Sequence, residues 1–223
     1  MKRNSFLIDF NGLPGSGKST IALSVCDLLD AKLLSEIYKP SKKRLLTIIK
    51  NIRFISFSQF VSFLRLFIIS KSKNMVVNAF LNLILTYKTY KTSASKYMIV
   101  DQGLLQNLLS CFYYEQISTR HKKIIIKIFK SFCKRFDKKL VVNVDLPLSE
   151  TIVRINGRTN GGSRVDVLCD SQKEELLKSL SLKVAVLRKI YSQVASDYIN
   201  IDSSDDVYSN AERIIKQIAT ATI

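Results

Sequence analysis

The sequence predicts an α/β fold of three layers, in which a five-stranded parallel β-sheet has helices on both faces. Five short stretches along the chain are almost continuously apolar, as strands buried on both faces are. Helix-length segments separate them, and this alternation is typical of a doubly wound sheet. The predicted strands are residues 5–10, 31–36, 96–101, 139–145 and 197–202.

Length and composition predict one globular domain over residues 1–223, since 47% of the residues are hydrophobic and no repeat interrupts the chain. The four cysteines form no CxxC pair, so we expect free thiols in a reducing compartment. The first apolar run is short and contains Asp9, which is unlike a signal peptide. We therefore expect a cytoplasmic protein, with peripheral membrane attachment left open. The single histidine, His121, is predicted at the surface of a basic helix.

The charge is strongly basic, with 35 Lys and Arg against 18 Asp and Glu. Residues 37–100 hold twelve basic residues and no acidic one. Such a field favours anionic partners, namely nucleotides, nucleic acid or an acidic membrane surface. A solvated basic surface without a ligand is the alternative.

The interval between the second and third predicted strands, residues 37–95, is long for one crossover. We expect helices over about 42–51, 56–70 and 74–89. Eleven of the sixteen residues in 54–69 are apolar. The segment is shorter than the roughly 20 residues that a helix needs to span a bilayer. A buried core helix is favoured there over a helix that binds a membrane or a partner.

A glycine-rich stretch follows the first predicted strand and precedes a predicted helix. It reads GLPGSGKS from Gly12 to Ser19 and matches GxxxxGK[ST], the phosphate-binding loop of nucleoside triphosphate-binding proteins. Glycines let successive N–H groups point at phosphate oxygens, and the helix N-terminus adds positive charge. We expect ATP to bind here, with Lys18 at the β- and γ-phosphates and the Ser19 hydroxyl on Mg²⁺. The predicted nucleotide-binding residues of the loop are Gly12, Pro14, Gly15, Ser16, Gly17, Lys18, Ser19 and Thr20.

Two carboxylates follow predicted strands and are expected at the same edge of the sheet. Asp101 follows four apolar residues, a pattern typical of the aspartate that holds Mg²⁺ directly or through water. Glu36 ends the second strand and is a candidate base for an attacking hydroxyl. Ordinary strand-end carboxylates are the alternative for both.

Three arginines surround a glycine-rich segment after the fourth strand. Arg154 and Arg158 are four residues apart, on one face of a helix, and Arg164 follows in the loop. We expect a lid over residues 154–168 whose guanidinium groups neutralise charge on transferring phosphates. A surface loop with incidental arginines is the alternative.

Together these motifs resemble the P-loop kinases of the thymidylate kinase and deoxynucleoside kinase group. The resemblance rests on GLPGSGKST, LLSE, YMIVDQG, VDLPLSETIVRINGRTNGGSRVD and YINIDSSDDVYSNAERIIKQI, which occur in the family's order along nearly the whole chain. It implies the P-loop NTPase fold with five parallel strands and a lid. It also implies transfer of the γ-phosphoryl group of ATP to a hydroxyl or a phosphate.

The resemblance also implies roles for particular residues. Glu36 corresponds to a carboxylate that serves as base or substrate ligand, and Asp101 to the acidic residue of an Asp-Arg or Glu-Arg pair. Arg154 becomes a candidate to stack on adenine, and Ser203 lies in the segment 201–206 that lines the adenine pocket. Residues 37–95 correspond to the acceptor-binding region. Gln102 stands where the family usually has arginine.

The resulting hypothesis is an Mg²⁺-dependent kinase that uses ATP and an anionic or hydroxyl-bearing acceptor, with nucleosides or nucleotides first. A sugar, a lipid-linked alcohol or a polynucleotide end stays open as acceptor, as does assembly into a homodimer. The hypothesis from another class is an ATP-binding regulatory or membrane-associated protein with little transferase activity.

Overall fold

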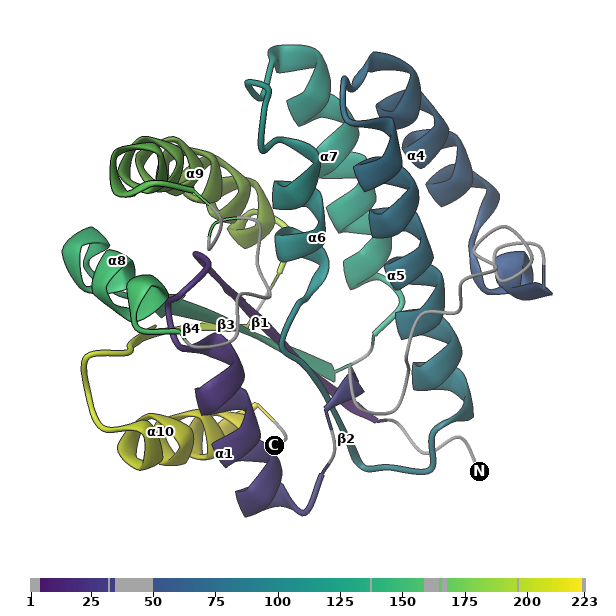
Figure 1. Ribbon diagram of the computed structural model, residues 1–223. Coiled ribbons are helices and arrows are strands. Elements are labelled where there is room, and N and C mark those ends of the chain that lie inside the picture. Colours follow the sequence, from purple (N-terminus) through teal and green to yellow (C-terminus); the bar gives the residue numbers. More distant parts are fainter. Residues whose placement is uncertain are drawn as a thin grey trace.

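The computed structural model contains a four-stranded parallel sheet with helices on both faces (Figure 1). It describes residues 5–31, 33–34, 50–136, 138–158, 165, 168–195 and 197–221. The strands are β1 (Phe6–Gly12), β2 (Tyr97–Val100), β3 (Lys138–Asp145) and β4 (Tyr198–Asp202), in the spatial order β2-β1-β3-β4. The parallel sheet with helices on both faces therefore confirms the predicted fold class.

One face of the sheet is covered by α1 (Lys18–Leu29) and α10 (Val207–Thr220), which pack side by side. Alternate residues of a strand point to opposite faces, so Phe6, Ile8 and Phe10 of β1 are buried against these two helices. Leu7 is buried in the other core. Because both faces of β1 are covered, its apolar residues run almost without interruption.

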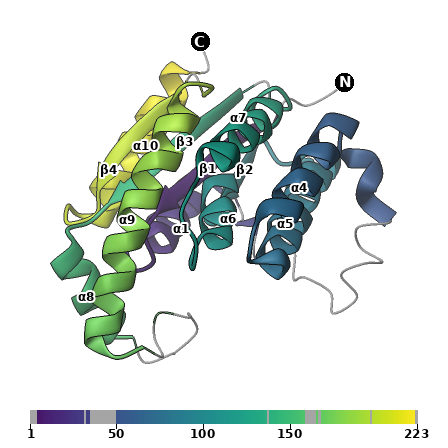
Figure 2. The ribbon, with the colours of Figure 1, turned by 90° about the horizontal axis from the view of Figure 1, so that it is seen from above.

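The opposite face is covered by a larger group of helices (Figures 1 and 2). These are α5 (Lys73–Thr92), α6 (Leu104–Cys111), α7 (Thr119–Cys133) and α9 (Asp170–Ser192). Helix α4 (Phe57–Ile69) packs against α7 and α5, and a short 3-10 turn, η1 (Ile52–Phe54), precedes it. Helix α8 (Leu148–Asn156) follows β3 and contacts α9.

The prediction of a fifth strand over residues 31–36 is wrong for the described residues. Only Leu33 pairs, in an isolated parallel bridge to Ile99 on the outer side of β2. Leu33 and Leu34 are buried in the two different cores. A strand requires successive pairs along a ladder, and a single bridge does not provide one. Residues 32, 35 and 36 of this stretch lie outside the described part of the chain.

The interpretation of residues 54–69 as a buried core helix needs correction. Helix α4 buries only Gln59, Ser62, Phe63 and Leu66. Phe57 is 82% exposed and Ile68 is 65% exposed, and the other exposed apolar side chains of α4 are Phe60, Leu64 and Phe67. Their spacing places them on one side of the helix. No helix within the described residues has the length and apolarity needed to cross a membrane.

His121 is buried, so the prediction that it lies at the surface is wrong. Its ring Nδ1 lies 3.2 Å from the backbone nitrogen of Ser118, and the Ser118 hydroxyl accepts the His121 N–H. This reciprocal arrangement caps the first turn of α7. As predicted, Cys26, Cys111, Cys133 and Cys169 form no disulfide bonds.

Asp9 is a buried carboxyl group in the middle of β1. Its Oδ2 accepts a hydrogen bond of 2.9 Å from the Tyr191 hydroxyl, and a Cβ atom at Gly103 would lie 1.3 Å from its Oδ1. Burial raises the pKa of Asp9 to about 7, although hydrogen bonds from Tyr191 and the Leu104 backbone oppose the shift. The close approach of β1 to the start of α6 therefore depends on glycine at position 103.

Replacing Asp9 with asparagine is expected to change how the stability depends on pH. The folded protein holds a proton on Asp9 up to about pH 7, whereas the unfolded chain releases it near 3.8. The wild-type unfolding free energy should therefore fall between pH 4 and pH 7, by at most about 4 kcal/mol from this group. Urea unfolding of Asp9→Asn should lack that fall. Asp27→Asn, at an exposed position of α1, is the control, and an equal pH slope in wild type and Asp9→Asn would contradict the prediction.

Candidate active site

The glycine-rich loop lies at the carboxyl end of β1, where a parallel sheet opens to ligands. Gly15 and Gly17 adopt φ values of 86° and 84°, which favour glycine. The loop leads directly into α1, and no side chain of the described residues caps the first turn of that helix. Its free N–H groups are suited to an anion such as a phosphate.

Close contacts across the loop explain its first glycine. Gly12 pairs with Val144 of β3, and a Cβ atom at position 12 would lie 2.4 Å from the Val144 carbonyl oxygen. The same Cβ would lie 2.7 Å from the Ser16 hydroxyl. Glycine therefore lets the beginning of the loop lie against the end of β3.

Lys18 turns its ammonium group back into the loop. Its Nζ donates to the Leu13 carbonyl at 2.6 Å, and the side chain is buried. The pKa of Lys18 is lowered to about 7, mainly by burial and also by the positive charges of Arg158 and Arg188, while Asp101 opposes the shift. A cation held in this way gains strongly from an anion placed beside it.

Ser19, in the first turn of α1, and Asp101, directly after β2, bring two oxygen ligands together. The Ser19 hydroxyl donates to Asp101 Oδ2 at 3.1 Å, and Asp101 is buried. No cluster of three or more His, Cys, Asp or Glu side chains suited to a metal occurs within the described residues. Mg²⁺ needs only one or two protein ligands when phosphates and water complete its shell. Ser19 and Asp101 therefore fit the predicted Mg²⁺ site.

Arg154 connects α8 to the loop that follows β4. It donates to the Ser203 hydroxyl and to the Ser203 carbonyl, both at 2.8 Å. A Cβ atom at Gly17 would lie 3.0 Å from Arg154 Nη1, so this arginine packs against the phosphate-binding loop. The bidentate contact holds its guanidinium plane in one orientation.

A cavity of about 510 Å³ lies between these elements. That volume is within the range typical of sites for small ligands. Its lining includes Gly15, Gly17 and Thr20 of the first loop and helix, Arg154 and Arg158, and Ser203, Ser204, Asp205, Asp206 and Val207 after β4. The cavity begins at the phosphate-binding loop and ends among polar groups after β4.

The structure thus gathers most of the predicted site residues at one edge of the sheet. The phosphate-binding loop, Asp101, Arg154, Arg158 and Ser203 all lie around the cavity or beside Lys18. Glu36 and Arg164 lie outside the described residues. Of the predicted lid over 154–168, the described residues are 154–158, 165 and 168, and they do not show a lid.

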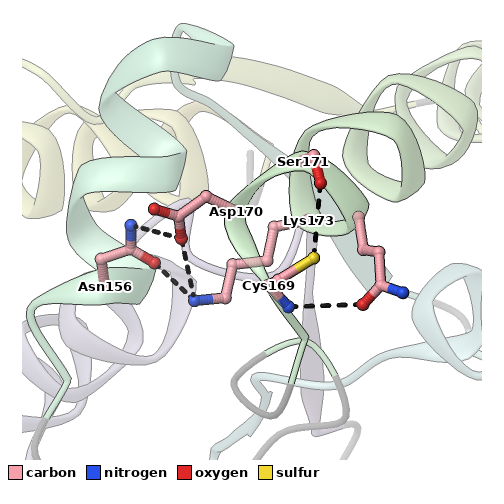
Figure 3. Close-up of polar contacts among 6 residues, drawn as sticks. Asn156, Cys169, Asp170, Ser171 and Lys173 are labelled. Carbon is pink, nitrogen blue, oxygen red and sulfur yellow. Dashed lines mark hydrogen bonds and ion pairs between the residues drawn. The ribbon is translucent and has the colours of Figure 1, made fainter.

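The two ends of the predicted lid segment are joined by a polar contact (Figure 3). Lys173 Nζ, near the start of α9, donates to Asn156 Oδ1 at 2.7 Å at the end of α8. Asn156 Nδ2 in turn donates to Asp170 Oδ1 at 3.1 Å. Lys173 is buried, so the pair ties α8, which carries Arg154, to α9.

Sequence reasoning did not predict an ion pair between two charged side chains near the phosphate-binding loop. Arg188 of α9 forms an ion pair of 2.5 Å with Asp145, the last residue of β3. No local motif marks Arg188, because it is one basic residue in a long amphipathic helix. Asp145 offered a weak signal, since it is a carboxylate at the end of a buried strand.

The fold is similar to that of deoxyadenosine kinase from M. mycoides. The structure of that enzyme with bound dATP gives a TM-score of 0.56 at 18% sequence identity, over 96% of this chain and 100% of that chain. The structures with bound dCTP and with the products dCMP and a flexible dCDP give TM-scores of 0.54 and 0.53 at the same identity. They also cover 96% of this chain, and 100% and 99% of their own.

No protein-family model and no curated protein matches the sequence. The structural similarity nevertheless extends over nearly the whole chain, as the order of the sequence motifs predicted. At 18% identity it shows a shared fold.

Proposed function

We propose that this protein is an Mg²⁺-dependent kinase that transfers the γ-phosphoryl group of ATP to a hydroxyl group of a nucleoside. The proposal rests mainly on the phosphate-binding loop and the neighbouring cavity being continuous with each other. A phosphate-binding loop with a buried lysine opens into a cavity of about 510 Å³ lined by Arg154 and Ser203. Phosphates on the loop would place the base of the nucleotide in that cavity.

In the proposed reaction the acceptor oxygen attacks the γ-phosphorus while the bond to the β–γ bridging oxygen breaks. ADP leaves with the electron pair of that bond. The acceptor proton passes to a base, and we assign that role to Glu36. Lys18, Arg158 and Arg164 neutralise the charge on the transferring group, which is the main protein contribution to phosphoryl transfer. Ser19 and Asp101 would hold Mg²⁺, which would supply further charge neutralisation at the phosphates.

Deoxynucleosides are the first acceptors to test. The structures of similar fold are of a deoxyadenosine kinase with dATP or dCTP bound, or with the product dCMP. The acceptor-binding region remains assigned to residues 37–95, partly outside the described chain. Sugars, lipid-linked alcohols and polynucleotide ends are the competing acceptors.

The test is transfer of labelled γ-phosphate from ATP in the presence of Mg²⁺. The panel contains deoxynucleosides, ribonucleosides, nucleoside monophosphates, sugars, polyprenols and oligonucleotides, and Lys18→Ala is the blank. A labelled deoxynucleoside that is absent from the blank is the expected result. If only a sugar, a lipid or an oligonucleotide is labelled, that compound class is the acceptor and the nucleoside assignment is wrong. Phosphate release without any labelled acceptor would argue against the kinase.

A second candidate function is favoured by the exposed apolar side of α4. Phe57, Leu64 and Ile68 project from a segment in which residues 37–100 contain no acidic residue. An ATP-binding protein attached to an anionic membrane would use such a surface. Sedimentation with anionic liposomes, but not with neutral ones, together with absence of phosphoryl transfer, would favour this alternative.

A further inference from the structure

Arg188 of α9 is a cation beside the phosphate-binding loop that no sequence motif predicted. Its Nη1 pairs with Asp145 Oδ1 at 2.5 Å, and its Nη2 donates to the Val144 carbonyl at 3.2 Å. That carbonyl is the atom that a Cβ at Gly12 would meet at 2.4 Å. The guanidinium group and the first glycine of the loop therefore contact the same oxygen.

The electrostatic environment of the loop is consistent with this position. The positive charges of Arg158 and Arg188 both lower the pKa of Lys18, behind the larger effect of burial. Lys18, Arg158 and Arg188 thus place three basic groups close to the loop. Asp145 forms its ion pair with Arg188. Arg188 Nε is buried and has no hydrogen-bond partner among the described residues. Clustered cations at a glycine-rich loop are suited to a polyanion.

The position of Arg188 along the loop indicates which part of a nucleotide it would meet. The cavity for the base borders Gly15, Gly17 and Thr20. Arg188 lies at the opposite end, beside Gly12. A phosphate chain that runs from the cavity along the loop would therefore present its terminal phosphate to Arg188.

Resting on the proposed function, we infer that Arg188 binds the terminal phosphate of the nucleoside triphosphate. Asp145 pairs with this guanidinium group in the unliganded protein and would compete with the phosphate for it. The Asp145 backbone carbonyl also accepts the Ser203 N–H at 2.9 Å, so the same residue supports the loop that lines the base cavity. A planar guanidinium on a helix gives a fixed contact for the γ-phosphate.

The test compares the binding of ATP with that of ADP by calorimetry, using the full chain with Mg²⁺. Arg188→Met should weaken ATP binding about tenfold to a hundredfold and ADP binding only a few-fold, since ADP lacks the terminal phosphate. Arg188→Lys should restore part of the preference for ATP. Lys189→Met removes an exposed positive charge from the next position of α9 and should leave both affinities unchanged.

Asp145→Asn separates phosphate binding from a merely structural role. This variant breaks the ion pair but keeps the cation, so ATP should bind as well as in the wild type or more tightly. If Asp145→Asn weakens ATP as Arg188→Met does, or if Arg188→Met affects ATP and ADP equally, the inference is wrong. Failure of the wild type to bind ATP would instead overturn the proposed function and this inference with it. Thermal unfolding of each variant establishes that it is folded.

Discussion

Replacing Lys18 with alanine is expected to reduce ATP turnover roughly a hundredfold or more. Lys18 is buried at the loop, and among the described residues its ammonium group donates to the Leu13 carbonyl at 2.6 Å and the Ser16 hydroxyl at 3.5 Å. A bound triphosphate would supply the strong anionic partner that this group lacks. Steady-state turnover with the acceptor found in the transfer assay measures the loss.

The fold should not depend on this lysine. The pKa of Lys18 is lowered in the folded protein, so below the unfolded value of 10.5 its charge opposes folding. Lys18→Ala should therefore unfold at the wild-type temperature or above it near pH 7. Lys216→Ala, at an exposed position of α10, is the matched control and should keep full turnover. Full turnover in Lys18→Ala would show that the phosphate-binding loop does not act in the reaction as proposed.

The lowered pKa of Lys18 also predicts that ATP binding takes up a proton. Above about pH 7 the unliganded lysine is largely neutral, and a triphosphate beside it restores the ammonium form. Calorimetry at pH 8 in two buffers of different ionisation enthalpy should show uptake of close to one proton per ATP. Lys18→Ala should show almost no proton uptake. Equal proton uptake in this variant and in the wild type would contradict the lowered pKa of Lys18.

Replacing Asp101 with asparagine is expected to reduce Mg²⁺-dependent turnover roughly a hundredfold while ATP binding without metal is kept. Asp101 is buried, and its Oδ2 accepts the Ser19 hydroxyl at 3.1 Å. The amide retains the shape of the side chain but removes the negative charge that attracts a divalent cation. Without metal, losing a negative charge near the phosphates should leave ATP affinity equal or higher.

Two measurements separate a metal ligand from a structural strand end. Turnover is measured over a range of Mg²⁺ concentrations, and ATP affinity is measured with the metal chelated. Asp101→Asn should need much more Mg²⁺ for half-maximal turnover, whereas Glu174→Gln, at an exposed position of α9, should behave as the wild type. Equal losses of turnover and of metal-free ATP affinity would assign Asp101 to the fold instead.

Local sequence patterns were sufficient for the four described strands and for the phosphate-binding loop. Strands buried on both faces leave continuous apolar runs, and a loop that curls around phosphates requires glycines at fixed spacing. The same logic predicted a fifth strand, where Leu33 makes only a bridge to Ile99. Composition alone does not reveal whether an apolar run finds successive partners along a neighbouring strand.

Burial of individual side chains was less predictable. The sequence suggested a core helix at 54–69 and a surface position for His121, and both predictions were wrong. Helix α4 exposes Phe57 and Ile68, while His121 is buried as part of the cap of α7. Burial of a helix depends on which other elements pack against each of its faces. The sequence of that helix alone does not contain this information.

The sequence by itself determined that this protein has an α/β fold with a phosphate-binding loop, because those features depend on residues close together along the chain. Only the tertiary structure decided which distant residues complete the site. Arg154 meets Ser203 across 49 positions, Ser19 meets Asp101 across 82, and Arg188 meets Asp145 across 43. These contacts arise because parallel strands bring their carboxyl ends to one edge, and no local pattern records which side chains meet there.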